Sequence, residues 1–307
     1  MIWIIVGSVL LFLICLILIL AYILYKRAFY SPIKGQNNEF NLAQGLNYQG
    51  VANKANECVA VMLKIPYEDL ETKSKEGFKL HGYFYKSEGS NEYVIMFHGY
   101  RRTARRSFSG LTMDLLKEHK NVILADFRGH GQSEGHKITL GKKEQYDVLS
   151  WINFAKEHFG EDIKITIVGV SMGATSVLMA SDKINDDRVK IIADSPYISS
   201  KQIIKLIIRA KKKSVAIFYP LTLLSALIFC HAYLKYDVTD YVKNSNNEIL
   251  IIHSGYDRAV PYQESLRVEA CNKEHVTVEI FEGIEHGLCY LKCTDEYRKL
   301  FFDFINK

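Results

Sequence analysis

The chain has 307 residues, of which 48% are apolar and 24% are charged, and its formal net charge is +5. These proportions are those of an ordinary folded protein, and the length suits one large α/β domain with additions. The positive charge is small and dispersed, and no aromatic-basic ribonucleoprotein pattern occurs, so we expect no nucleic-acid partner. The six cysteines show no compact disulfide framework, which favours a reducing compartment.

An apolar segment without charged residues runs from Ile2 to Tyr25. At 1.5 Å per residue it is long enough to cross a bilayer core of roughly 30 Å. A cleaved signal peptide is the rival interpretation, but the start lacks basic residues and no convincing small-x-small cleavage site follows. We therefore expect residues 1–27 to form a single-pass anchor in the cell membrane. Lys26, Arg27 and Lys34 follow the span, and the positive-inside rule then places the rest of the chain in the cytoplasm.

A polar segment follows the anchor, and we interpret residues 28–57 as a linker to a catalytic domain at 58–307. In that domain, strands and helices alternate from Tyr93 onward, which predicts an α/β fold with a doubly wound, mainly parallel sheet. The expected strands are 59–65, 77–86, 93–97, 121–126, 163–168, 189–193, 248–253 and 276–281. The expected helices are 103–119, 141–158, 262–271 and 294–305.

The alternation stops in an insertion at about 196–247, far longer than a simple connection needs. A basic piece at 201–213 precedes an apolar piece at 215–234. We expect a helical lid over the active site, whose apolar underside would supply an acyl pocket. A second membrane span at 215–230 is the alternative, against which Pro220 and the shortness of the run both argue.

The most informative motif is Gly169-Val170-Ser171-Met172-Gly173, between an expected strand and an apolar helical run. This is the G-x-S-x-G pattern of a nucleophile elbow, in the strand–turn–helix context that the elbow requires. A serine on so tight a turn has a strained backbone, and residues two before and two after it come too close for a β-carbon. An ordinary glycine-rich strand-to-helix turn is the alternative for this stretch alone.

A nucleophilic serine needs a base to take its proton and an acid to orient that base. His286 lies in a loop after the last expected strand, whereas His275 sits at a strand start without such a loop. Asp257 follows the preceding strand, and Asp194 is the rival acid because it also ends a strand. The order Ser171, Asp257, His286 is that of a triad built around this elbow.

An oxyanion hole requires two backbone N–H groups aimed at the reacting oxygen. Met172 supplies one by following the nucleophile, and we expect Tyr100, just after His98-Gly99 at a strand end, to supply the other. Side chains do not define these donors, so position in the chain is the basis for both assignments.

Together these motifs resemble those of the α/β-hydrolase superfamily, and more narrowly the membrane-anchored bacterial serine hydrolases of the serine aminopeptidase-like and acylglycerol lipase-like branch. The resemblance covers about residues 59–307. It implies a Ser-Asp-His triad, an acyl-enzyme intermediate, no cofactor and a lid between two late strands. Some members are called cell-surface hydrolases, which conflicts with the orientation given by the positive-inside rule, so both sides of the membrane stay open. The motifs are His98-Gly99, Asp126-Phe127-Arg128-Gly129-His130-Gly131-Gln132-Ser133, Gly169-Val170-Ser171-Met172-Gly173, Gly255-Tyr256-Asp257 and Glu285-His286.

Two other constellations are less convincing. Gly129-His130-Gly131 lacks the third glycine of a dinucleotide fingerprint, because Glu134 stands there. His286, Cys289 and Cys293 could be read as zinc ligands, but a fourth ligand at proper spacing is missing. We therefore expect no metal and no cofactor.

Arginines cluster after the oxyanion loop, where a solvated helix start is the simple interpretation and contact with anionic lipid or an acidic substrate is the alternative. We interpret two further residues, Arg128 and His130, as structural in their loop. The clustered arginines are Arg101, Arg102, Arg105 and Arg106.

The sequence thus predicts a membrane-anchored serine hydrolase that cleaves small-molecule or lipid carboxylic esters. A serine peptidase or amidase is one alternative. A catalytically inactive, membrane-tethered binding protein is an alternative of another class.

Overall fold

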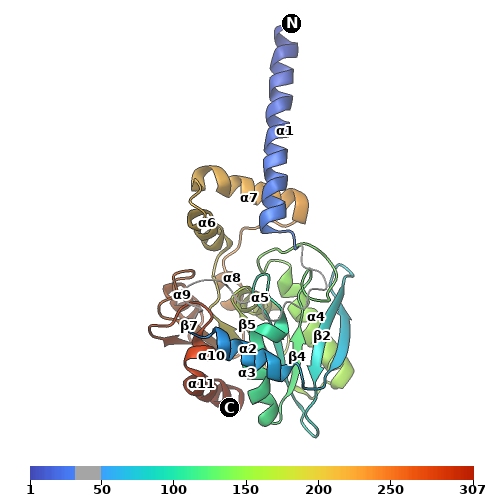
Figure 1. Cartoon of the computed structure of the whole chain (residues 1–307), viewed down its shortest axis with the longest axis vertical. Helices are drawn as coiled ribbons and strands as arrows, with labels where there is room; N and C mark the ends of the chain where they lie inside the picture. Colours follow the sequence, from blue (N-terminus) through green and yellow to red (C-terminus); the bar gives the residue numbers. More distant parts are fainter. Residues whose placement is uncertain (32–49) are drawn as a thin grey trace.

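A computed structural model of the chain describes residues 1–31 and 50–307 and shows an eight-stranded sheet with helices packed against it (Figure 1). The strand order is β1-β2-β4-β3-β5-β6-β7-β8, in which β3 to β8 are parallel and β1 and β2 are antiparallel additions at one edge. The prediction of a mainly parallel α/β sheet is confirmed. The strands are β1 (Glu68–Lys73), β2 (Lys79–Tyr85), β3 (Glu92–Phe97), β4 (Asn121–Ala125), β5 (Lys164–Val170), β6 (Lys190–Asp194), β7 (Ile249–Ser254) and β8 (Val276–Phe281).

Helices cover both faces of this sheet. One hydrophobic cluster includes Trp151 of α4 and Val177 of α5, and a second includes Leu111 of α3 and Phe301 of α11. The sheet is therefore doubly wound. The helices are α1 (Ile2–Ala28), α2 (Ala52–Met62), α3 (Ala104–Lys117), α4 (Glu144–Phe159), α5 (Met172–Ala180), the 3-10 turn η2 (Ser181–Lys183), α6 (Ser200–Ala210), α7 (Val215–Cys230), α8 (Thr239–Val242), α9 (Gln263–Cys271), α10 (Cys289–Lys292) and α11 (Thr294–Ile305).

The central strands are apolar throughout because both of their faces are buried. In β3, Ile95 and Phe97 face the cluster of α4 and α5, whereas Val94 and Met96 face the cluster of α3 and α11. Side chains alternate between the faces of a strand, so each face receives every second residue. The two layers hold the carboxyl ends of the parallel strands at one edge, where the loops carry the predicted site.

The predicted strand at 59–65 is wrong. Residues up to Met62 belong to α2, and the first strand is β1, with the polar sequence Glu-Asp-Leu-Glu-Thr-Lys. Val59 and Met62 are buried three residues apart, the spacing of one helix face and not of a strand. Only Leu70 is buried in β1, as in an edge strand whose other residues meet solvent. The predicted linker at 28–57 therefore overlaps α2, and its part from 32 to 49, with Lys34, lies outside the described residues.

The N-terminal helix α1 is 27 residues long and is the one helix, within the described parts of the chain, that is long and apolar enough to cross a membrane. It projects from the domain (Figure 1). Beyond its end, Phe29 is fully buried, its carbonyl accepts a hydrogen bond from the Ile138 amide at 2.7 Å, and Tyr30 forms a bridge with Lys137. The end of α1 is thus built into the domain.

The insertion between β6 and β7 folds into helices, of which α6 and α7 are the longest. Both lie on the side of the domain from which α1 projects (Figure 1). Aromatic rings join α7 to α1, because Phe229 contacts Tyr22 and Tyr25 with ring centroids 5.4 and 5.3 Å apart. The helical character of this insertion agrees with the sequence, while its role as a lid stays a prediction.

Candidate active site

The turn after β5 has the geometry of a nucleophile elbow. Ser171 has φ +54° and ψ −111°, in the left-handed half of φ space that non-glycine residues rarely adopt. A β-carbon at Gly169 would lie 2.3 Å from the Gly173 carbonyl carbon, and one at Gly173 would lie 2.0 Å from the Phe97 oxygen. Both glycines are therefore required by the close approach of backbone that the sequence motif predicted.

The structure brings together the three predicted triad residues from three loops at the carboxyl edge of the sheet. His286 Nε2 lies 3.0 Å from Ser171 Oγ, and His286 Nδ1 lies 2.6 Å from Asp257 Oδ2. These are hydrogen-bond distances, with the imidazole between hydroxyl and carboxylate. In this arrangement an Nδ1–H would donate to Asp257 and leave Nε2 to accept the serine proton.

Asp257 is held in a site that favours its ionised form. Its Oδ1 accepts hydrogen bonds from the amides of Ala259 and Val260 at 2.8 and 2.7 Å, and its Oδ2 lies 3.4 Å from His253 Nε2. Burial opposes ionisation, but hydrogen bonds to His253 and His286 outweigh it and hold the pKa of Asp257 well below its ordinary value. The carboxylate is thus a fixed negative charge beside the imidazole.

The rival acid, Asp194, occupies a different environment. It ends β6, is buried, and accepts a hydrogen bond from Ser195 Oγ at 2.8 Å. Burial raises the pKa of Asp194 above its ordinary value. Its backbone carbonyl accepts the Ser171 amide at 2.8 Å, so the residue supports the elbow through its main chain. The Nδ1 side of His286 meets Asp257 instead.

The two predicted oxyanion donors belong to segments next to Ser171. Met172 is the first residue of α5, where the helix itself offers no acceptor for the amide. Gly99, just before Tyr100, lies against the nucleophile, because a β-carbon there would be 3.5 Å from Ser171 Cβ. The Tyr100 amide therefore belongs to a loop in contact with the serine, as an oxyanion hole requires.

The oxyanion loop is tied to the end of α1. The Tyr100 hydroxyl donates to the Ala28 carbonyl at 2.7 Å, and one Arg101 nitrogen donates to the carbonyls of Arg27 and Tyr30, each at 2.9 Å. Arg101 therefore differs from both interpretations of the arginine cluster, because its guanidinium binds backbone carbonyls of the protein itself. It joins the N-terminal helix to the loop beside the nucleophile.

Two histidines fix the position of this loop through hydrogen bonds to backbone amides. The Phe127 amide donates to His98 Nε2 and the Arg101 amide to His130 Nε2, both at 3.1 Å. His130 Nδ1 can then donate to the Arg128 carbonyl at 3.0 Å. Burial lowers the pKa of His130 to about 3, so its neutral ring accepts the amide at neutral pH.

Arg128 is anchored by carboxylates. Its guanidinium contacts Asp147 at 2.6 Å and Glu76 at 2.8 Å, and Asp147 also accepts the Arg128 amide. A bidentate pair of this kind fixes the path of the chain. The contacts of Arg128 and His130 agree with a structural role for both.

No group of three or more His, Cys, Asp or Glu side chains within residues 1–31 and 50–307 is arranged to hold a metal ion. Of the residues weighed as zinc ligands, His286 faces Ser171 and Asp257, and the buried Cys289 lies 3.1 Å from Ser254 Oγ.

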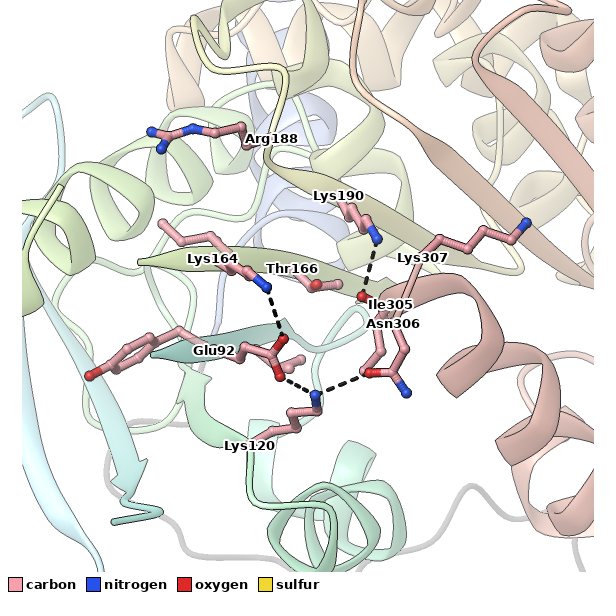
Figure 2. A pocket seen from close by; sticks show the side chains of 12 residues that line it. Glu92, Lys120, Lys164, Thr166, Arg188, Lys190, Ile305, Asn306 and Lys307 are labelled. Carbon is pink, nitrogen blue, oxygen red and sulfur yellow. Dashed lines mark hydrogen bonds and ion pairs between the residues drawn. The ribbon is translucent and has the colours of Figure 1, made fainter. Parts of the chain in front are cut away.

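A basic hollow of about 370 Å³ lies at the opposite edge of the sheet, where β3, β5 and β6 begin (Figure 2). Glu92 pairs with Lys120 and lies 3.7 Å from Lys164. Lys190 donates to the carbonyls of Phe304 and Ile305 at the end of α11, both at 3.1 Å. A cation at a helix C-terminus stabilises that helix. These contacts give the hollow a structural role, and the triad lies elsewhere.

Comparisons with known proteins agree with this fold. Residues 89–228, a little under half of the chain, match a family model described as serine aminopeptidase, S33. A protein of Bacillus subtilis, uncharacterized protein YqkD, is 26% identical over 76% of this chain and 77% of its own length. Uncharacterized protein YfhR of Escherichia coli K12 is 24% identical over 78% of this chain and 80% of its own.

Solved structures show the same architecture. The Pyrococcus furiosus esterase Pf2001 superposes with a TM-score of 0.66 at 22% identity, over 90% of this chain and 98% of that chain. The esterase EaEST from Exiguobacterium antarcticum gives a TM-score of 0.61 at 18% identity, over 78% of this chain and 100% of that chain. The chain has the α/β-hydrolase fold, and the family model together with these neighbours supports an enzyme of the hydrolase class.

The sequence does not predict the roles of two side chains at this site, those of His253 and Tyr100. His253, fully buried behind Asp257, also contacts Ser265 Oγ at 2.7 Å and the Val260 carbonyl at 3.0 Å. A histidine at the end of an otherwise apolar strand, four residues before the acid, was the available signal. The other is the side chain of Tyr100, whose contact with Ala28 spans two segments that no local pattern connects.

Proposed function

We propose that this chain is a membrane-anchored serine hydrolase that cleaves carboxylic esters through an acyl-enzyme intermediate. Ser171 is the nucleophile, His286 the general base and then general acid, and Asp257 the carboxylate that orients it. The backbone amides of Tyr100 and Met172 form the oxyanion hole. The observation that carries the proposal is the hydrogen-bonded series from Ser171 Oγ through His286 to Asp257, at 3.0 and 2.6 Å.

The reaction follows from this geometry. His286 Nε2 takes the Ser171 proton as Oγ attacks the acyl carbon, and the resulting oxyanion accepts hydrogen bonds from the two amides. The imidazolium is stabilised by ionised Asp257 and donates its proton to the departing alkoxide. Water, deprotonated by the same nitrogen, then attacks the acyl-enzyme and releases the acid. The proton transfers use Ser171, His286 and Asp257, which lie within hydrogen-bond distance of one another in series.

Membrane attachment completes the proposal. We assign α1 as a single-pass anchor, because 27 residues of helix extend about 40 Å and exceed a bilayer core. Lys26 and Arg27 in its last turn support a cytoplasmic position for the domain by the positive-inside rule, and the extracellular side is the alternative. The insertion containing α6 and α7 serves as the lid, and the substrate is a small-molecule or lipid ester.

A fluorophosphonate probe tests the nucleophile directly. The full-length protein in detergent should be labelled, Ser171→Ala should not, and Ser150→Ala, on the outer part of α4, should be labelled like the wild type. Thermal unfolding of each variant checks that it is folded. A folded wild-type protein that resists labelling would refute the proposal and favour the inactive, membrane-tethered binding protein instead.

A serine peptidase or amidase is the second candidate, favoured by the aminopeptidase description of the matching family model. The comparison of p-nitrophenyl esters with aminoacyl anilides on the wild type and Ser171→Ala separates the two. Faster Ser171-dependent turnover of the anilides would assign the amide reaction, and faster turnover of the esters would support our proposal.

A further inference from the structure

The side of the domain from which α1 projects carries an exposed apolar surface. Helix α7 has no charged residue from Val215 to Cys230, yet its Ile217 and Leu227 are 59% and 51% exposed. Ile207 of α6 and Tyr233, which follows α7, are exposed as well. Large apolar side chains exposed on and next to the two adjoining helices indicate a partner that covers them.

The insertion that contains α6 and α7 is strongly basic. No Asp or Glu occurs from Ser195 to Tyr236, whereas seven basic residues do. The net charge of the whole chain is only +5, so the remainder is net negative and the positive charge is concentrated in this insertion. Apolar residues beside lysines and arginines are typical of a surface that binds anionic lipid. The basic residues are Lys201, Lys205, Arg209, Lys211, Lys212, Lys213 and Lys235.

The position of α1 sets the level of this surface relative to a bilayer. Residues 2–20 of α1 are exposed along their whole length and extend about 28 Å, close to the thickness of a hydrocarbon core. Ala21 is the first buried residue of α1, and Tyr22 and Tyr25, next along the helix, contact Phe229 of α7. Tyrosines followed by Lys26 and Arg27 are typical of the boundary between membrane and water. The contact between α1 and α7 therefore lies at that boundary.

We propose that α6 and α7 form a docking surface for an anionic lipid bilayer. Ile217 and Leu227 enter the boundary between headgroups and acyl chains, and the basic residues of the insertion contact the headgroups. This inference rests on the membrane anchoring in the proposed function. Helix α7 has 16 residues and a length of about 24 Å, so it is too short to span the hydrocarbon core of the bilayer. In this proposal it lies along the membrane surface.

This arrangement identifies the source of the substrate. The oxyanion loop lies at the end of α1, because Tyr100 bonds to Ala28. An ester dissolved in the leaflet next to α7 therefore needs no passage through bulk water to reach Ser171.

Quenching of an introduced tryptophan tests the docking surface in the full-length protein. In a Trp3→Phe background, which leaves only the fully buried Trp151, we would introduce Ile217→Trp and reconstitute the protein into vesicles of anionic phospholipid with brominated acyl chains. The expected loss of fluorescence at position 217 is about half or more, because an interfacial helix is buried on the order of 5–10 Å into the headgroup and acyl boundary.

Val61→Trp in the same background is the matched control. Val61 is 52% exposed, similar to Ile217, but it lies on α2, away from α1 (Figure 1). We expect no quenching there by bromolipid and full quenching by aqueous acrylamide.

The requirement for basic residues is tested by the combined substitution Lys211→Gln, Lys212→Gln and Lys213→Gln and by zwitterionic vesicles, since each basic residue near an anionic surface is worth about fivefold in association.

The proposal is overturned if position 217 is quenched by acrylamide and not by bromolipid. It is also overturned if the protection of position 217 from acrylamide depends on protein concentration, because that dependence would show that a second copy of the chain covers α7. Equal quenching in zwitterionic and anionic vesicles would refute the role of headgroup charge. None of these measurements depends on turnover, and fluorophosphonate labelling of Ser171 in the same vesicles reports separately on the proposed chemistry.

Discussion

Asp257→Asn is a precise test of the proposed triad, because the surroundings allow the new amide only one orientation. Oδ1 of Asp257 accepts two backbone amides, at 2.8 and 2.7 Å, so the asparagine oxygen must occupy that position. Its NH₂ group then faces His286 Nδ1, at the position of the present 2.6 Å contact. An NH₂ group donates, and the imidazole must accept it at Nδ1 and carry its proton on Nε2. That tautomer cannot take the proton of Ser171.

The expected loss is about 10³- to 10⁴-fold in kcat, or about 4–5.5 kcal/mol of transition-state stabilisation, as for the wrong tautomer in a serine triad. Asp194→Asn is the matched control. Its side chain bonds Ser195, while its link to Ser171 runs through a backbone carbonyl that the substitution keeps. We expect it to change kcat by less than about tenfold.

The assay is steady-state hydrolysis of a p-nitrophenyl ester by full-length protein in detergent, with unfolding curves to show that both variants are folded. Because the pKa of Asp257 lies below its ordinary value, the wild-type carboxylate stays ionised across the neutral range, and the deficit of Asp257→Asn should persist at every neutral pH. If Asp194→Asn lost as much activity as Asp257→Asn, or more, the assignment of the acid would be refuted.

Three further predictions follow from the surrounding structure. Tyr100→Phe removes the hydrogen bond to Ala28, worth about 1 kcal/mol, and should lower kcat by up to about fivefold with KM nearly unchanged. The pKa of His130 is lowered to about 3 by burial, so the unfolded chain binds its proton more tightly, and the free energy of unfolding should fall by on the order of 4 kcal/mol as pH decreases from about 6.5 to 3. His130→Gln should remove this part of the slope in denaturant titrations. Gly173→Ala places a β-carbon 2.0 Å from the Phe97 oxygen and should cost more than about 4 kcal/mol or prevent folding, as measured by urea unfolding.

Each of these has an outcome that contradicts it. Unchanged kcat in Tyr100→Phe would show that the oxyanion loop needs no support from Ala28. A His130→Gln variant with the wild-type pH slope would mean that the histidine is not held neutral by the fold. Gly50→Ala is the control for Gly173→Ala, because no atom lies within 4 Å of its β-carbon. Equal stability of the two alanine variants would refute the steric argument.

The sequence predicts best those parts of the chain where local pattern and final environment agree. Gly169 and Gly173 were interpretable because a tight turn excludes a β-carbon whatever surrounds it, and the structure gives those contacts. The central strands were recognisable because burial on both faces leaves an apolar run, as in Tyr93 to Phe97. The placement of Asp257 and His286 followed from the order of loops at one edge of a parallel sheet.

Elements whose pattern is ambiguous or whose partners are distant were not predicted. The run from Val59 to Ile65 contains enough β-branched and apolar residues for a strand, and only its packing shows Val59 and Met62 on one helix face. The edge strand β1 is polar because solvent covers most of it. The bond from Tyr100 to Ala28 joins residues 72 positions apart, a pairing that depends on the complete fold.

The junction between α1 and the domain governs where the chain can be cut. Phe29 belongs to the core, its carbonyl accepts a hydrogen bond from the Ile138 amide, and the Ser31 amide donates to the His136 backbone carbonyl. Truncation at residue 31 would therefore delete a buried phenylalanine as well as the anchor, a loss of about 3–5 kcal/mol by analogy with large core deletions. A fragment that begins at Ala28 keeps the aromatic ring of Phe29 and the carbonyl that Tyr100 uses. The sensible excision point thus falls inside the final turn of the helix.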